Sequence, residues 1–103
     1  DSDEILDLLA EHAYQELVKA GPTSLTANVN ALAELKPAIR YRVIRLAGMT
    51  LGGHLHRSHV LEIDRLVTNW HGQKPLAVPS VRVERTGENI VFKSTKTLKP
   101  GAC

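Results

Sequence analysis

The chain has 103 residues, 43% of them hydrophobic and 4% aromatic, which allows one small domain with a largely aliphatic core. No apolar run is long enough to span a bilayer, and no segment resembles a signal peptide. The one cysteine, Cys103, cannot form an internal disulfide, so we predict a cytoplasmic protein with no membrane partner.

Charge is distributed unevenly along the chain. Residues 1–35 carry one basic and seven acidic side chains, whereas residues 36–103 carry twelve basic and four acidic ones. The balances of −6 and +8 give the net charge of +2. This asymmetry predicts an acidic segment joined to a basic surface that binds an anionic partner.

The N-terminal third predicts one helix and one short extended segment. Ser2 is expected to cap a helix whose buried stripe comprises Leu6, Leu9, Ala13 and Leu17, widened by Ile5 and Val18. Gly21-Pro22 is a typical helix stop. After it, Leu25, Ala27 and Val29 alternate as in a strand, and Asn30 is expected to cap a short helical turn.

Two further helices are predicted in the middle of the chain. The first runs from Pro37 to about Leu51 and buries residues 39, 43, 47 and 51 at four-residue spacing. Gly48 is unfavourable within it by about 1 kcal/mol unless close packing requires it. The second begins near Ser58 and has a stripe that reaches Trp70, with His71-Gly72 as its end.

The C-terminal third changes to a period of two. Three short strands are predicted around residues 76–78, 81–83 and 90–92, with turns at 79–80 and 86–89. Residues 94–103 have no pattern and are expected to form a flexible tail. The prediction is a single α+β domain over residues 1–103, with three helices and a short C-terminal antiparallel hairpin or small sheet.

Metal and catalytic sites are not favoured. His54, His56 and His59 place three imidazoles within six residues, but no Cys pair or carboxylate cluster completes a zinc site, and His59 suits the start of a helix. No glycine-rich loop links a strand to a helix, and the serines lie in turns or caps. We therefore assign this chain no catalytic residue, no metal and no cofactor of its own.

Arginines are the most informative feature. The predicted binding residues are three on one helix and two near the next: Arg40, Arg42, Arg45, Arg57 and Arg65. Guanidinium groups bind phosphate through two parallel hydrogen bonds, although such residues also serve simply as a solvated helix face. The scarcity of aromatic residues argues against a single-strand-binding platform, so recognition of phosphates and shape is the better hypothesis.

Several segments resemble one enzyme family in their order and spacing. Residues 35–45 resemble the Leu-Pro-x-Ala-Leu-Arg-x-Arg-x-Leu-Arg stretch of tRNA(Ile)-lysidine synthases, in the domain after their ATP-pyrophosphatase domain. The resemblance continues through residues 59–67 and 70–74. Residues 76–83 are similar to the family's closing Val-x-Leu-Pro-Gly-Gly-x-x-Val hairpin, with Ser80 in place of the Gly-Gly.

This resemblance implies a tRNA-binding C-terminal fragment of a larger ligase. The parent enzyme would use ATP, magnesium and lysine to convert the wobble cytidine of the CAU anticodon of isoleucine tRNA to lysidine. Its ATP site would lie in the N-terminal ATP-pyrophosphatase domain, a second partner of this fragment, and a homodimer is left open. The alternative is a protein–protein adaptor, in which the acidic first helix and the basic second helix dock different partners.

Overall fold

The computed structural model describes residues 2–21, 24–78 and 80–95. Along the chain it places the elements α1 (Ser2–Leu17), β1 (Val18–Ala20), β2 (Ser24–Asn28), α2 (Val29–Ala33), α3 (Pro37–Thr50), α4 (Arg57–Thr68), β3 (Leu76–Val78), β4 (Val81–Thr86) and β5 (Asn89–Ser94). The prediction of an α+β fold is confirmed.

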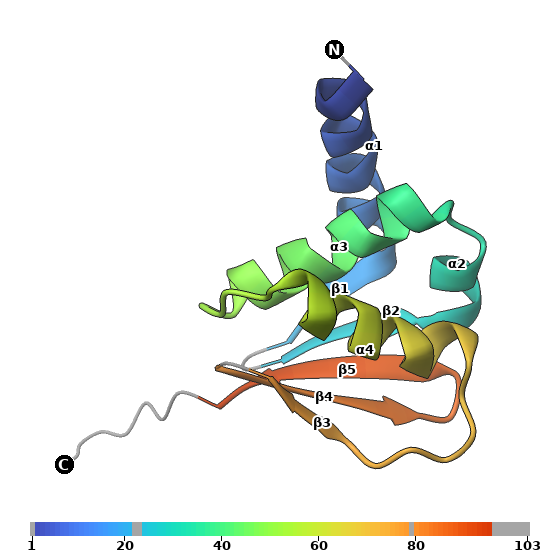
Figure 1. The fold of residues 1–103 in the computed structure, drawn as a ribbon, viewed down its shortest axis with the longest axis vertical. Coiled ribbons are helices and arrows are strands. Elements are labelled where there is room, and N and C mark those ends of the chain that lie inside the picture. Colours follow the sequence, from blue (N-terminus) through green and yellow to red (C-terminus); the bar gives the residue numbers. More distant parts are fainter. Residues whose placement is uncertain (1, 22–23, 79, 96–103) are drawn as a thin grey trace, which may run out of the picture.

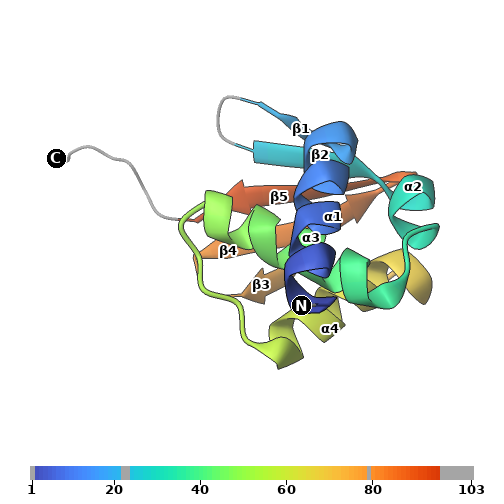
Figure 2. The same cartoon turned by 90° about the horizontal axis from the view of Figure 1, so that it is seen from above.

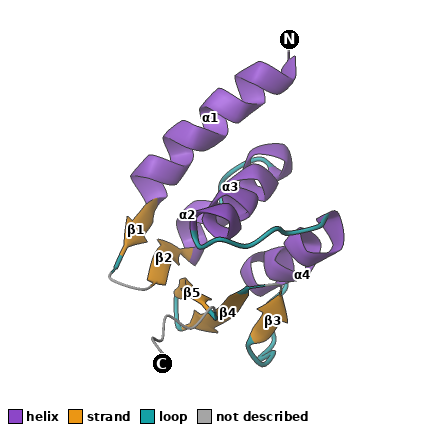
Figure 3. Ribbon diagram, turned by 90° about the vertical axis from the view of Figure 1, so that its left-hand side faces the viewer, coloured by secondary structure: helices purple, strands orange, loops and turns teal. Residues whose placement is uncertain are grey.

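The strands form one antiparallel sheet in the order β1-β2-β5-β4-β3. Its helices lie on one face, as Figures 1 and 3 show. Leu25, Phe92 and Val83 are aligned across β2, β5 and β4 and are all buried, so this row anchors the sheet to the helices. The opposite face carries alternating residues such as Arg82 and Lys93, which are cross-strand partners and exposed.

The sheet is larger than the predicted C-terminal hairpin. The extended segment around Leu25 and Ala27 is β2, and it pairs with β5 from the other end of the chain. Val18–Ala20, interpreted from the sequence as the end of the first helix, instead forms β1, with Val18 paired to Ala27. The β-branched side chain of Val18 suits an extended backbone, and pairing with β2 stabilises that conformation. Local periodicity does not reveal this pairing.

The first helix buries the predicted stripe only in part: Ala13 is buried and Leu17 packs against the core, but Leu9 does not. Ala10 and Ala13 are buried. Leu9, expected in the core, is 48% exposed, and Ile5 and Leu8 are more exposed still, at 57% and 65%. Small alanine side chains let α1 approach α3 closely, and α1 points away from the sheet in Figure 1. The buried stripe therefore passes through Ala10 rather than through Leu9 and Ile5, because close approach to α3 favours the small side chain.

The second predicted helix is confirmed as α3, with Val43, Ile44 and Ala47 buried. Gly48 has a packing reason, because a Cβ atom there would lie 2.6 Å from Leu55 Cδ1. The short α2 is capped by Asn28 rather than by Asn30, since Asn28 Oδ1 accepts a 3.0 Å hydrogen bond from the Ala31 backbone N–H.

The third predicted helix and the C-terminal strands are also confirmed. Helix α4 buries Val60, Ile63 and Val67 but ends at Thr68, so Trp70 lies in the following loop rather than on its stripe. The hairpin β4–β5 turns at Gly87, whose φ is 63°. Ser80, where the resembling family has glycine, adopts φ 65°, a conformation that favours glycine.

The end of the described chain differs from the predicted tail. Strand β5 continues to Ser94, and the Thr95 backbone N–H donates a 3.1 Å hydrogen bond to the Ser80 carbonyl. The rest of the predicted tail, residues 96–103 with Cys103, lies outside the described residues, as does Pro79. In the described ranges, no helix is both long enough and apolar enough to cross a membrane.

Candidate nucleic-acid interface

Arg40 does not lie on the exposed face of its helix. The residue is 6% exposed, and its Nε and Nη2 donate to the two carboxylate oxygens of Asp64 on α4, the second at 3.3 Å. Its Nη1 donates a 3.0 Å hydrogen bond to the Leu35 carbonyl. Arg40 therefore ties α3 to α4 within the core, and its guanidinium is not presented to a phosphate at the surface.

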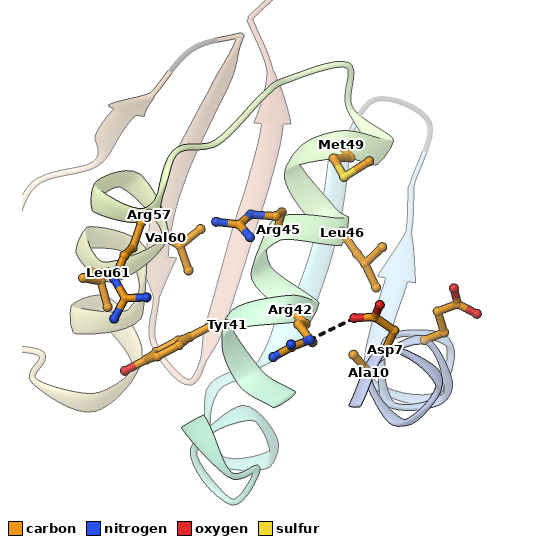
Figure 4. A pocket seen from close by; sticks show the side chains of 11 residues that line it. Asp7, Ala10, Tyr41, Arg42, Arg45, Leu46, Met49, Arg57, Val60 and Leu61 are labelled. Carbon is orange, nitrogen blue, oxygen red and sulfur yellow. Dashed lines mark hydrogen bonds and ion pairs between the residues drawn. The ribbon is translucent and has the colours of Figure 1, made fainter. Parts of the chain in front are cut away.

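A groove lies between α1, α3 and α4, with a volume of about 490 Å³. In Figure 2, α1 lies across α3 and α4 lies to one side of them, and Figure 4 shows the side chains that line the groove. Its lining combines three arginines, two carboxylates and an apolar base: Arg42, Arg45, Arg57, Asp7, Glu11, Ala10, Tyr41, Leu46, Met49, Val60 and Leu61. The groove brings together three of the five predicted binding residues.

Arg42 joins the acidic helix to the basic one. Its Nε donates a 2.9 Å hydrogen bond to Asp7 Oδ1 on α1, and its Nη1 donates another to the Ala38 carbonyl at 2.9 Å. The arginine side chain is 29% exposed and the Asp7 side chain 65%. Part of the charge asymmetry in the sequence is thus neutralised inside the domain, and the acidic and basic helices form one surface rather than two.

Arg45 and Arg57 are the exposed cations of the groove. Within the described part of the chain, neither side chain has a hydrogen bond or ion pair. Arg45 extends from α3 toward α4, and Arg57 lies in the first turn of α4 (Figure 4). Two guanidinium groups on neighbouring helices, above an apolar base, are suited to bind phosphate oxygens from both sides.

Arg65 lies outside the groove lining but on the same helix as Arg57. Arg57, Leu61 and Arg65 recur at four-residue intervals, so they follow one side of α4. Arg65 is exposed and lies in the last helical turn, where the helix dipole favours a cation. The basic surface therefore continues from the groove along α4.

The histidines have a structural role at the start of α4. The His56 backbone N–H donates a 3.1 Å hydrogen bond to His59 Nδ1, and the two ring centroids are 5.4 Å apart. The expectation that His59 packs at the helix start is confirmed. Among the described residues, no group of three or more His, Cys, Asp or Glu side chains is placed to hold a metal ion.

Sequence reasoning missed the acidic and aromatic parts of the groove. The sequence pattern does not indicate that Asp7, Glu11 and Tyr41 line a groove. The signal for the acidic part was present in the charge asymmetry, since an acidic helix and a basic helix within one small domain attract each other. Nothing in the local pattern around Tyr41 indicated that it lines a groove.

A known protein family matches the central part of the chain. The family model described as the TilS substrate binding domain matches residues 28–88, more than half of the chain. The chain belongs to this family. The matched region of this TilS substrate-binding domain includes all of α3 and α4, and with them the five predicted binding arginines.

Individual relatives of this chain share one name, tRNA(Ile)-lysidine synthase. The chain is 43% identical over 94 residues to the tRNA(Ile)-lysidine synthase of Leifsonia xyli subsp. xyli, covering 89% of this chain and 28% of that protein. It is 38% identical to the tRNA(Ile)-lysidine synthase of Thermobifida fusca over 97 residues, which are 91% of this chain and 29% of the relative. The corresponding enzyme of Streptomyces coelicolor is 33% identical over 99 residues, with 90% and 27% covered. The chain thus spans less than a third of the length of these relatives.

Proposed function

We propose that this domain binds tRNA and that the groove between α1, α3 and α4 contacts its phosphate backbone. The observation that carries the proposal is the pair of exposed guanidinium groups of Arg45 and Arg57, which have no partner among the described residues. Membership of a substrate-binding domain family and the tRNA substrate named by the relatives point to the same ligand.

The groove is suited to binding rather than to catalysis. Its polar side chains are arginines and carboxylates, together with the Tyr41 hydroxyl, and Asp7 is engaged with Arg42. Arginine stays protonated at neutral pH and therefore cannot act as a general base there. We infer that the groove positions the nucleic acid while the reaction takes place elsewhere in the enzyme.

The whole enzyme is proposed to be a tRNA(Ile)-lysidine synthase. In this proposal it converts the wobble cytidine of a CAU anticodon to lysidine with lysine and ATP. ATP and magnesium are assigned to an ATP-pyrophosphatase domain that this chain does not include. The support is that relatives with this name are more than three times as long as the part matched here.

The test is a salt series of tRNA affinity. An isoleucine tRNA transcript with a CAU anticodon is titrated with the wild-type chain and with an Arg45→Gln/Arg57→Gln variant. Each lost phosphate contact should lower the slope of log affinity against log salt by about 0.7–0.9 units. The double variant should therefore bind more weakly and lose about 1.4–1.8 slope units.

The matched control is Arg82→Gln/Lys93→Gln on the uncovered face of the sheet. Both residues are exposed, they are cross-strand partners, and their removal changes the net charge by the same amount. This control should keep the wild-type slope. Equal losses in the two double variants would mean that net charge, and not the groove, attracts the tRNA.

A further inference from the structure

Trp70 is a partly exposed aromatic side chain outside the groove. It is the only tryptophan of the chain, lies two residues after the end of α4, and is 37% exposed. Tryptophan is highly buried on average, and its indole offers the largest aromatic surface of any side chain. Trp70 lies in the loop after α4 and not on the buried stripe of that helix, so its ring is not needed to fill the core.

The indole ring is held in place by a fixed cation. Arg85 Cζ lies 5.3 Å from the centre of the Trp70 ring. Arg85 is itself held by two hydrogen bonds, from Nη1 to the Leu66 carbonyl at 2.9 Å and from Nε to the Gly87 carbonyl at 3.0 Å. Ring and guanidinium are therefore ordered before any ligand arrives, which lowers the entropy cost of binding.

The loop around the ring is closed by its own hydrogen bonds. The Gln73 side chain accepts a 2.7 Å hydrogen bond from the His71 backbone N–H and donates a 3.1 Å bond to the Asn69 carbonyl. Gly72 has a φ of 88°, and the space where a Cβ would stand is open. His71 and Lys74, one and four residues after Trp70 in the chain, are exposed on the same loop.

We propose that Trp70 is a stacking site for one unpaired nucleobase of the RNA whose phosphates lie along α4. This inference rests on the proposed function and adds a base contact to it. An exposed indole stacks on any base through its π-face, and a neighbouring guanidinium strengthens such contacts. A single ordered ring, rather than a row of aromatic side chains, is suited to bind one base of a folded RNA. That base would be displaced from its own stack.

The distance along α4 fits one continuous contact. From Arg57 to Thr68 the helix advances about 17 Å at 1.5 Å per residue, and Arg65 lies on the same side as Arg57. That rise equals about five base steps of 3.4 Å in a stacked strand. An RNA segment that extends from the groove at the start of α4 to the loop that carries Trp70 therefore needs about five stacked nucleotides.

The first experiment uses Trp70 emission, because the chain has one tryptophan and the signal arises from this ring alone. Stacking of a base on the indole should quench the emission as the CAU-anticodon tRNA transcript is titrated. Inorganic polyphosphate provides the matched anion without bases. It should compete for the arginines and leave the Trp70 emission unchanged.

The second experiment replaces the ring and follows binding with end-labelled tRNA. Trp70→Leu should weaken tRNA binding by about 5- to 150-fold, the range measured for loss of one base–aromatic stack. Its slope of log affinity against log salt should stay at the wild-type value, unlike that of the groove variant. Trp70→Phe keeps a smaller aromatic ring and should recover most of the affinity.

The outcomes separate this inference from the proposed function. If tRNA binds through Arg45 and Arg57 but neither quenches Trp70 nor responds to Trp70→Leu, the stacking site is wrong and the groove stands. Quenching by polyphosphate as well as by tRNA would also overturn it, because no base is then involved. If tRNA does not bind at all, both proposals fail. A thermal melt of each variant checks that the fold is retained, and the quenching experiment needs no substitution.

Discussion

The buried pair of Arg40 and Asp64 gives the sharpest prediction about stability. We expect Asp64→Asn to destabilise the domain strongly, because it removes the charge that balances a guanidinium in the core. The two side chains are 8% and 9% exposed, so water provides little compensation. Arg40→Met/Asp64→Leu, which removes both charges and keeps apolar volume, should be close to neutral or stabilising.

The magnitude follows from the hydrogen bonds that Arg40 makes. Two of its donors face the Asp64 carboxylate and one faces the Leu35 carbonyl. An asparagine amide oxygen can still accept from one of the two donors, so the other loses its acceptor, which costs about 1–3 kcal/mol. Breaking one side of a buried ion pair costs about 3–5 kcal/mol in general. At roughly 4–8 °C per kcal/mol, a loss of 3 kcal/mol lowers the melting temperature by about 12–24 °C.

The assay is urea and thermal unfolding of wild type, Asp64→Asn and the double variant, with Arg45→Gln as the exposed control. Arg45→Gln should stay within about 0.5 kcal/mol of wild type. The double variant should also keep its tRNA affinity, since Arg40 is placed in the core and not in the groove. A loss below 1 kcal/mol for Asp64→Asn, or a tenfold loss of tRNA binding in a stably folded double variant, would refute this reasoning.

Two further substitutions test contacts made by α3, one in its packing against Leu55 and one in its ion pair with α1. Gly48→Ala should destabilise the domain by about 1–2 kcal/mol in urea unfolding, because a Cβ would lie 2.6 and 2.8 Å from Leu55 Cδ1 and Cγ and overpacking outweighs the gain in helix propensity. A stabilised variant would contradict this, and Leu55→Ala should make the alanine tolerable. Asp7→Asn should tighten tRNA binding by up to about fivefold, since the Asp7–Arg42 pair is a largely exposed ion pair that competes with phosphate. Weaker binding would show that Asp7 instead orients Arg42 for its ligand.

Local sequence patterns predicted a helix or strand correctly where that element buries one regular face. The stripe of α4 and the alternation of β4 and β5 could be read directly, since period and burial agree there. In α1 they agree only in part: Ala13 and Leu17 lie on the predicted stripe, but Leu9 is exposed and Ala10 is buried instead. A hydrophobic pattern cannot show which face a helix presents when small residues are needed for close approach.

The site was predicted in composition but not in arrangement. The sequence indicated that arginines would bind an anion, and it named Arg45 and Arg57 among them. It could not separate these from Arg40, which lies on the same helix as Arg45, because the difference is made by Asp64, 24 residues away from Arg40. A carboxylate on the neighbouring helix turns one arginine into a core residue and leaves the others at the surface.

The sequence alone therefore determined the class of fold, the basic character of the surface and the family resemblance, since these depend on periodicity, charge and motif order. The tertiary structure decided how β2 joins β5 across the chain, which arginines are buried and how three helices form one groove. These features arise from contacts between residues distant in sequence. Their free energies depend on burial and on partners that no local window contains.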